Sequence, residues 1–279
     1  MVLPLNTESA PLVWKYAFLT SYVGKAYSGW QRQPKFSSIQ ETLERTLEKI
    51  TGECISVVGS GRTDSGVHAI GQVGHFVLRA KEWDSQVLFR AMNGLLPSDI
   101  QVLSLQPVAL DFHAQRSAVQ KQYSYYFQQG SAAIPGLEPY SWWIRKPLDL
   151  EAMNRGLSSL LGEHDFKPFQ ASGSKPGPTV RKIIEAEVVL EAPGVFLQAH
   201  GTSLVRVRVV GTGFLKQMVR GIAGTLLQVG EGRRSAECFK QILEAQDRNA
   251  VGPTAPARAL WLERVWYPDS FQLTWQGKP

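Results

Sequence analysis

The sequence predicts an α+β protein made of two halves, each with the βαββαβ order of a ferredoxin-like domain. Three observations support this fold class. Strand patterns of period two alternate with amphipathic helical patterns, and the same order of elements occurs twice. The 279 residues, 43% of them hydrophobic, can also fill a substantial core. The halves share no evident sequence similarity, so the repeat rests on the order of elements.

The first half begins with a strand at residues 15–23, where side chains of two kinds alternate. Ser38 and Glu41 then form a capping box at the start of a helix. Four further elements follow from short apolar runs and one apolar helix face. They are strands at 55–58 and 72–78, a helix at 84–93 and a strand at 100–105.

The second half opens with a strand at 117–128, on which Tyr123, Tyr125 and Phe127 alternate. A helix starts at Asp149, and a loop rich in Gly, Pro, Ser and Lys follows it at 167–179. The remaining elements are strands at 180–190 and 195–210, helices at 215–229 and 235–245, and a strand at 260–267. The expected division is therefore an N-terminal arm at 1–14, one half at 15–112 and the other at 113–279.

Composition restricts the partners. Lys and Arg number 30 against 24 Asp and Glu, and the sequence pI of about 9.3 favours a polyanionic partner. Cys54 and Cys238 supply neither a disulfide framework nor a CxxC pair, so we expect reduced thiols and no zinc. The N-terminus lacks the pattern of a secretory signal, and no apolar run reaches the ~20 residues of a membrane span. We therefore expect a cytoplasmic protein with no membrane partner.

The candidate catalytic stretch is residues 61–69, which reads GRTDSGVHA between two apolar runs. Its glycines permit close approach of a ligand to the backbone, and Asp64 is the candidate catalytic residue. An alternative is that Asp64 only caps the loop's own amides. Arg62 is either a surface ion-pair partner or a phosphate ligand. Arg220 lies near a helix start, where a cation is unfavourable, so it needs an anion such as Asp64.

Other chemistries find less support. Asp64, His68 and His75 could be metal ligands, but their spacing does not match a metal site, and we expect no metal. No GxSxG elbow, P-loop or GxGxxG motif is present, so we expect no nucleotide cofactor. Tyr123, at the start of its strand, could stack on a base. Two rival functions stay open: an RNA-binding protein without catalysis, and a metal-dependent hydrolase that uses Asp64 and His68.

These residues resemble a known family. Residues 61–69 are similar to the GRTDxGVHA signature of the tRNA pseudouridine synthase A (TruA) family, and further matches follow in order along the chain. They are GWQRQ at 29–33, SIQ at 38–40, DFHA at 111–114, SA at 117–118, YSY at 123–125, GFL at 213–215, MVR at 218–220, DR at 247–248 and TAP at 254–256. One departure is Val23, where the family often has Asp.

The resemblance implies a pseudouridine synthase fold, in which two α+β halves have sheets that meet at a central catalytic cleft. It implies a homodimer without cofactor that isomerises uridines 38, 39 and 40 of the tRNA anticodon stem-loop. By residue, it implies that Asp64 is the catalytic nucleophile, that Tyr123 contacts the uracil, that Arg62 handles the flipped nucleotide and that Arg220 pairs with Asp64. Such a reaction needs one ionised carboxylate, which a neighbouring arginine would favour.

Overall fold

The computed structural model describes residues 12–191 and 201–276 of the chain. In the first half, the order of elements is the predicted βαββαβ. The elements are β1 (Trp14–Tyr22), α1 (Ile39–Thr51), β2 (Val58–Gly59), β3 (His68–Leu78), α2 (Ser85–Leu95) and β4 (Ile100–Pro107). The strands lie in the order β4-β1-β3, and β2 pairs with β3, which gives the ferredoxin-like arrangement.

The second half repeats this arrangement with additions. Its elements are β5 (Gln120–Gln129), β6 (Trp142–Ile144), α3 (Leu150–Ser158), β7 (Gly162–Asp165), β8 (Val180–Leu190), β9 (Ser203–Gly211), α5 (Met218–Gly230), α6 (Cys238–Ala245) and β10 (Leu260–Trp266). The order β10-β5-β9-β8 matches β4-β1-β3-β2 of the first half, position by position. The predicted α+β class with two ferredoxin-like halves is confirmed.

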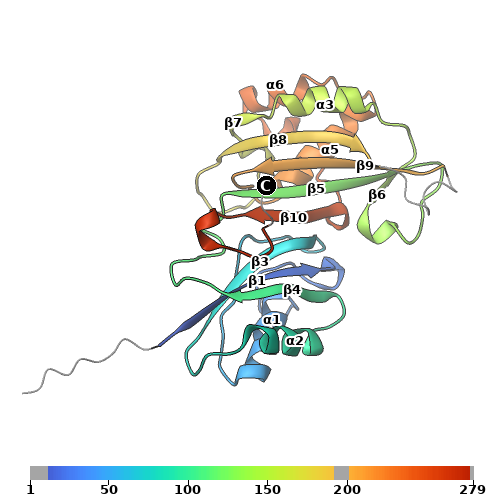
Figure 1. Cartoon of the computed structure of the whole chain (residues 1–279). Helices are drawn as coiled ribbons and strands as arrows, with labels where there is room; N and C mark the ends of the chain where they lie inside the picture. The colour runs from blue at the N-terminus through green and yellow to red at the C-terminus, as the bar shows by residue number, and fades with distance from the viewer. Residues whose placement is uncertain (1–11, 192–200, 277–279) are drawn as a thin grey trace, which may run out of the picture.

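The two sheets join into one continuous mixed sheet of order β4-β1-β3-β10-β5-β9-β8-β7, which Figure 1 shows from edge to edge. The joint is a short parallel pairing of β10 with β3, in which Trp261 lies opposite His68 and Leu262 opposite Ala69. A side chain at Gly71 would meet the Glu263 carbonyl oxygen at 1.9 Å, so only glycine allows this approach. The two sheets thus meet, as expected, and they do so through backbone hydrogen bonds between β3 and β10, a joint that we call the seam.

Local signals explain where the helices begin. Ser38 accepts a hydrogen bond from the backbone of Glu41 at the start of α1, and Asp149 accepts one from Ala152 at the start of α3. Asp84 caps α2 in the same way. Each cap satisfies amides that have no partner inside the helix. The predicted helix starts at these three places are therefore confirmed.

Several boundaries differ from prediction. β3 begins at His68 instead of residue 72, because its first residues pair with β1 and β10. β2 has two residues, since β10 occupies the other part of the same β3 edge. β6 and β7 were not predicted, because three or four residues carry too little periodicity. The start of the strand expected at 195–210 and most of the arm expected at 1–14 lie outside the described residues.

Each half of the sheet is covered by its own helices. In Figure 1, α1 and α2 lie beside β4, α3 and α6 lie beside β8, and α5 lies behind β8 and β9, where it also contacts β5. Nearly all residues of α5 are buried. No helix in the described ranges has both the length and the apolarity to cross a membrane.

Candidate active site

The loop between β2 and β3 carries Asp64 and is held by three hydrogen bonds. The Trp30 amide donates to the Thr63 carbonyl (3.1 Å), and the buried Tyr22 and Thr63 hydroxyls share a hydrogen bond of 2.9 Å. Ser65 donates to the Tyr27 carbonyl (3.1 Å). Because all three contacts come from residues 22–30, the first strand and its following turn fix the loop.

Glycines around this loop are required by close backbone approach. A side chain at Gly29 would meet the Thr63 carbonyl oxygen at 2.5 Å, and one at Gly24 would meet that of Val67 at 2.0 Å. Gly66 has φ of +80°, which a side chain would disfavour. The loop therefore packs as a rigid backbone against the turn that follows β1.

Asp64 faces Arg220, as the sequence predicted. Arg220 Nη1 lies 3.6 Å from Asp64 Oδ2, and the side chains are 15% and 23% exposed. Asp64 comes from the first half and Arg220 from α5 in the second, so the pair spans the seam between the halves. Because neither side chain is fully buried, the carboxylate is both paired with a cation and accessible.

Arg220 is aimed by a second contact. Its Nε donates to the Ala255 carbonyl (2.7 Å), and the Ala255 amide donates to the Arg220 carbonyl (3.1 Å). The next residue, Pro256, accepts a hydrogen bond from the Tyr125 hydroxyl (3.0 Å). The TAP motif at 254–256 thus orients the guanidinium from behind, while Nη1 faces Asp64.

Tyr123 on β5 lies close to the same carboxylate. Its ring is 8% exposed and packs edge-on against Phe214, with centroids 5.1 Å apart. Burial raises the pKa of the Tyr123 hydroxyl, and the neighbouring Tyr22 and Asp64 raise it further. Within the described ranges, no protein group hydrogen-bonds this hydroxyl. Tyr123 therefore presents a neutral phenol near the Asp64 carboxylate, free to bind a ligand.

Arg62 is exposed and makes no hydrogen bond or ion pair with the described residues. Its side chain is therefore available to an external partner. Val23, the departure from the family pattern, uses its backbone amide to donate to the Asp99 carbonyl (2.9 Å). Asp99 also accepts a hydrogen bond from the Tyr27 hydroxyl (2.7 Å), so a carboxylate just before β4 supports this turn.

His68 and His75 are structural. His68 Nδ1 accepts from the Gly24 amide (3.1 Å) and its Nε2–H donates to the Arg258 carbonyl (2.9 Å), so neither nitrogen is free for a metal. His75 Nδ1 accepts from the Ala114 amide (3.1 Å). In the part of the chain that the structure describes, no three His, Cys, Asp or Glu side chains are grouped as metal ligands. The hydrolase alternative thus loses the contribution of His68.

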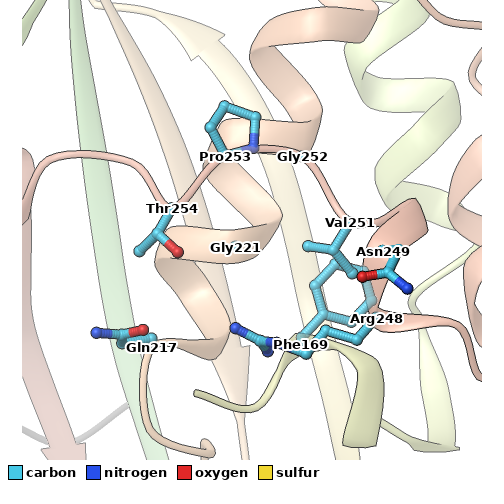
Figure 2. Close-up of a pocket in the computed structure, with 9 residues that line it drawn as sticks. All are labelled: Phe169, Gln217, Gly221, Arg248, Asn249, Val251, Gly252, Pro253 and Thr254. Atoms are coloured by element: carbon cyan, nitrogen blue, oxygen red, sulfur yellow. The ribbon is translucent and has the colours of Figure 1, made fainter. Parts of the chain in front are cut away.

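A hollow of about 350 Å³ lies beside the N-terminal part of α5 (Figure 2). It is lined by Phe169, Gln217, Gly221, Arg248, Asn249, Val251, Gly252, Pro253 and Thr254. Arg248 donates to the carbonyls of Pro168 and Gln170, which ties residues 248–254 to the turn at 167–170. None of Asp64, Tyr123 and Arg220 lines the hollow. One wall of the hollow is the segment 248–254, which leads directly to Ala255, the residue that contacts Arg220.

Two contributors were not anticipated from the sequence. Tyr22 bonds Thr63, and Lys121 Nζ donates to the Ser60 carbonyl (2.6 Å) at the start of the loop. Burial lowers the pKa of Lys121 to about 8, and the charge of Arg181 contributes. The available signal for Lys121 was its place two residues before Tyr123, which puts both side chains on one face of β5.

Comparison with known proteins adds a family. The sequence pattern described as tRNA pseudouridine synthase matches residues 19–115 and 157–268. The chain is 39% identical over 257 residues to the tRNA pseudouridine synthase A of Maridesulfovibrio salexigens, which covers 90% of both chains. It is 39% identical to the protein of that name from Streptococcus pneumoniae (strain Taiwan19F-14), over 91% of this chain and 99% of the relative.

A third relative, the tRNA pseudouridine synthase A of Myxococcus xanthus, is 41% identical over 89% of this chain and 90% of its own. Among solved structures, a Cbf5-Nop10-Gar1 complex aligns with a TM-score of 0.31 at 14% identity, over 76% of this chain and 45% of that chain. The chain belongs to the tRNA pseudouridine synthase A (TruA) family of isomerases.

Proposed function

We propose that this protein converts uridine to pseudouridine at positions 38, 39 and 40 of the tRNA anticodon stem-loop, with Asp64 as the catalytic nucleophile. The observation that carries the proposal is the carboxylate of Asp64 held 3.6 Å from the guanidinium of Arg220, beside the unpaired hydroxyl of Tyr123. The substrate class comes from the names of the sequence relatives. The net charge of +6 suits a polyanion.

The isomerisation breaks the bond from N1 of uracil to C1′ of the ribose and forms a bond from C5 to C1′. The C5 proton leaves and N1 gains a proton, so no oxidant, reductant or second substrate enters the balance. A carboxylate can act as nucleophile or stabilise positive charge on the ribose during this exchange. Asp64 supplies that carboxylate.

The neighbouring groups have separate roles. Arg220, fixed on the Ala255 carbonyl, keeps Asp64 aimed into the cleft. A paired base is inaccessible inside a stem, so it must flip out at a cost of a few kcal/mol. Arg62, exposed and unpaired within the described ranges, handles the flipped nucleotide. Tyr123 stacks on or hydrogen-bonds the uracil and, because its hydroxyl is neutral, serves as a donor.

The test is release of tritium from 5-tritiated uridine in a tRNA transcript, with a chelator present. The wild type should release tritium, and Asp64→Asn should release none while it binds tRNA with an affinity within a few-fold of wild type. Turnover by the Asp64→Asn protein would remove Asp64 from the mechanism. A wild type that binds tRNA and never releases tritium would support the alternative of RNA binding without catalysis.

Two further parts of the proposal need other measurements. Mapping the product at single-nucleotide resolution should find pseudouridine at 38, 39 and 40, and transcripts with cytidine at all three should give none. We propose that the protein works as a homodimer in the cytoplasm, which the family resemblance supports. Light scattering of the purified chain should then give twice its 31.0 kDa mass.

A further inference from the structure

A second group of cations lies beside the loop of Asp64. Lys121 reaches from β5 to the loop and donates to the Ser60 carbonyl at 2.6 Å. Its Nζ lies 3.1 Å from where a side-chain carbon of Gly61 would stand, so the ammonium rests directly on the loop backbone. Because residues two apart on a strand share a face, Lys121 and Tyr123 point to the same side of β5.

Lys121 has donors to spare and no counter-charge. An ammonium carries three N–H donors, and Lys121 uses one, on a backbone carbonyl. No carboxylate pairs with it in residues 12–191 and 201–276. Burial lowers its pKa to about 8, and repulsion from Arg181 adds to this effect. A partly buried cation without an acid nearby is stabilised by an anionic ligand.

Arg181, the second residue of β8, completes the group. Its Nη1 donates to the carbonyls of Pro178 (3.0 Å) and Val180 (2.6 Å), and again no carboxylate pairs with it among the described residues. A side chain at Gly213 would stand 3.5 Å from its Nε. Phe214, next to Gly213, packs on the ring of Tyr123, which links Arg181 to the site.

We propose that Lys121 and Arg181 bind a phosphodiester that flanks the target uridine. This inference rests on the proposed function, because it takes an RNA as substrate. Lys121 rests on the loop of Asp64, and Arg181, from another strand, lies near enough to repel its charge. A nucleotide that reaches Asp64 would bring its own backbone toward these two cations. Lysine binds phosphate as a point charge and arginine adds a fork of donors, so together they fix its position. Lys121 and Arg181 then position the nucleotide and leave the bond changes to Asp64.

The experiment neutralises the phosphate and the protein group in turn. An anticodon stem-loop RNA is made with one methylphosphonate, either 5′ or 3′ of the target uridine, or at a distant stem position. Binding and single-turnover rate are measured for the wild type, Lys121→Met and Arg181→Met. Lys240→Met serves as the matched control, since Lys240 lies on α6 with a side chain 70% exposed.

For wild type, one flanking methylphosphonate should weaken binding about tenfold or more, as loss of a hydrogen bond to a charged group does. The distant methylphosphonate should change it less than about twofold. Lys121→Met and Arg181→Met should each weaken binding of the unmodified RNA and respond less than about twofold to that same flanking substitution. Each should also lower the slope of log affinity against log salt by about 0.7 to 0.9. Lys240→Met should behave as wild type.

Two results would overturn the inference. In one, both variants keep the full wild-type response to the methylphosphonate, which would mean that Lys121 only holds the Ser60 carbonyl. In the other, the wild type is insensitive at both flanking linkages. Because binding is measured apart from turnover, a wild type that never forms pseudouridine contradicts the proposed function and leaves this test intact. Arg181→Met keeps the test valid even where Lys121→Met fails to fold.

Discussion

Removal of Arg220 tests the central ion pair. At 3.6 Å and an effective dielectric constant of about 20, two unit charges attract by about 4 to 5 kcal/mol before their desolvation is subtracted. Breaking a largely buried pair by removing one partner costs about 3 to 5 kcal/mol. Since Arg220 and Asp64 are partly exposed, we take the lower end. About 3 kcal/mol lost in the transition state corresponds to a rate about 100-fold lower.

Arg220→Lys separates charge from geometry. The guanidinium contacts two partners through different nitrogens, Nε on the Ala255 carbonyl and Nη1 toward Asp64. A lysine has one charged nitrogen and can satisfy one of them. Loss of one charge-assisted hydrogen bond, about 1.5 kcal/mol, predicts a rate about tenfold lower for Arg220→Lys and about 100-fold lower for Arg220→Met.

The assay is single-turnover tritium release, with circular dichroism and thermal unfolding to verify the fold. Arg155→Met is the matched control, because it removes an arginine from an exposed pair with Glu151 at 2.8 Å, worth about 0 to 1 kcal/mol. Arg220→Met with a rate within twofold of wild type, and with unchanged unfolding, would refute the role given to the pair. Equal rates for Arg220→Lys and Arg220→Met would refute the role of the second contact.

Three predictions concern stability. The pKa of His75 is lowered to about 4, chiefly by burial, so the unfolded chain binds the proton more strongly than the folded protein. The free energy of unfolding is therefore full above pH 6.5 and should fall by about 2 kcal/mol from pH 7 to pH 5, as measured by urea unfolding. His75→Asn should give a flatter pH profile. Gly224→Ala should lower the free energy of unfolding by about 2 kcal/mol or more, because the added methyl would meet the Pro253 carbonyl oxygen at 1.7 Å. In the same thermal unfolding assay, Gly94→Ala in α2 should stabilise the protein by up to about 1 kcal/mol, because its methyl meets nothing within 4 Å. Tyr22→Phe loses the buried bond to Thr63 and should cost about 1 kcal/mol in urea; an unchanged midpoint would contradict that contact.

Sequence patterns predicted the parts of the fold that local chemistry decides. Ser38, Asp84 and Asp149 begin helices because their side chains cap amides within three residues, a signal contained in the sequence itself. The parallel pairing of β3 with β10 joins segments almost two hundred residues apart and has no local signal. The same is true of β2, whose length depends on how much of the β3 edge β10 occupies.

For the site, the motif gave the residues and the structure gave their partners. The pairing of Asp64 with Arg220 was expected from the helix position of the arginine and from the family resemblance. The Ala255 carbonyl behind Arg220 could not be predicted, because a backbone acceptor leaves no trace in residue type. Lys121 was overlooked for a similar reason, since its partner is the Ser60 carbonyl.

The backbone seam between β3 and β10 governs more than sheet continuity. Its two paired positions lie four and five residues after Asp64, and Leu262 on the far side is opposite Tyr123 of β5. His68 clasps this joint by stacking on Trp261, with centroids 4.4 Å apart. The distance between Asp64 and Tyr123 is therefore set by the backbone pairing of β3, β10 and β5. Weakening this pairing would therefore separate the two halves and lower activity without changing any catalytic side chain.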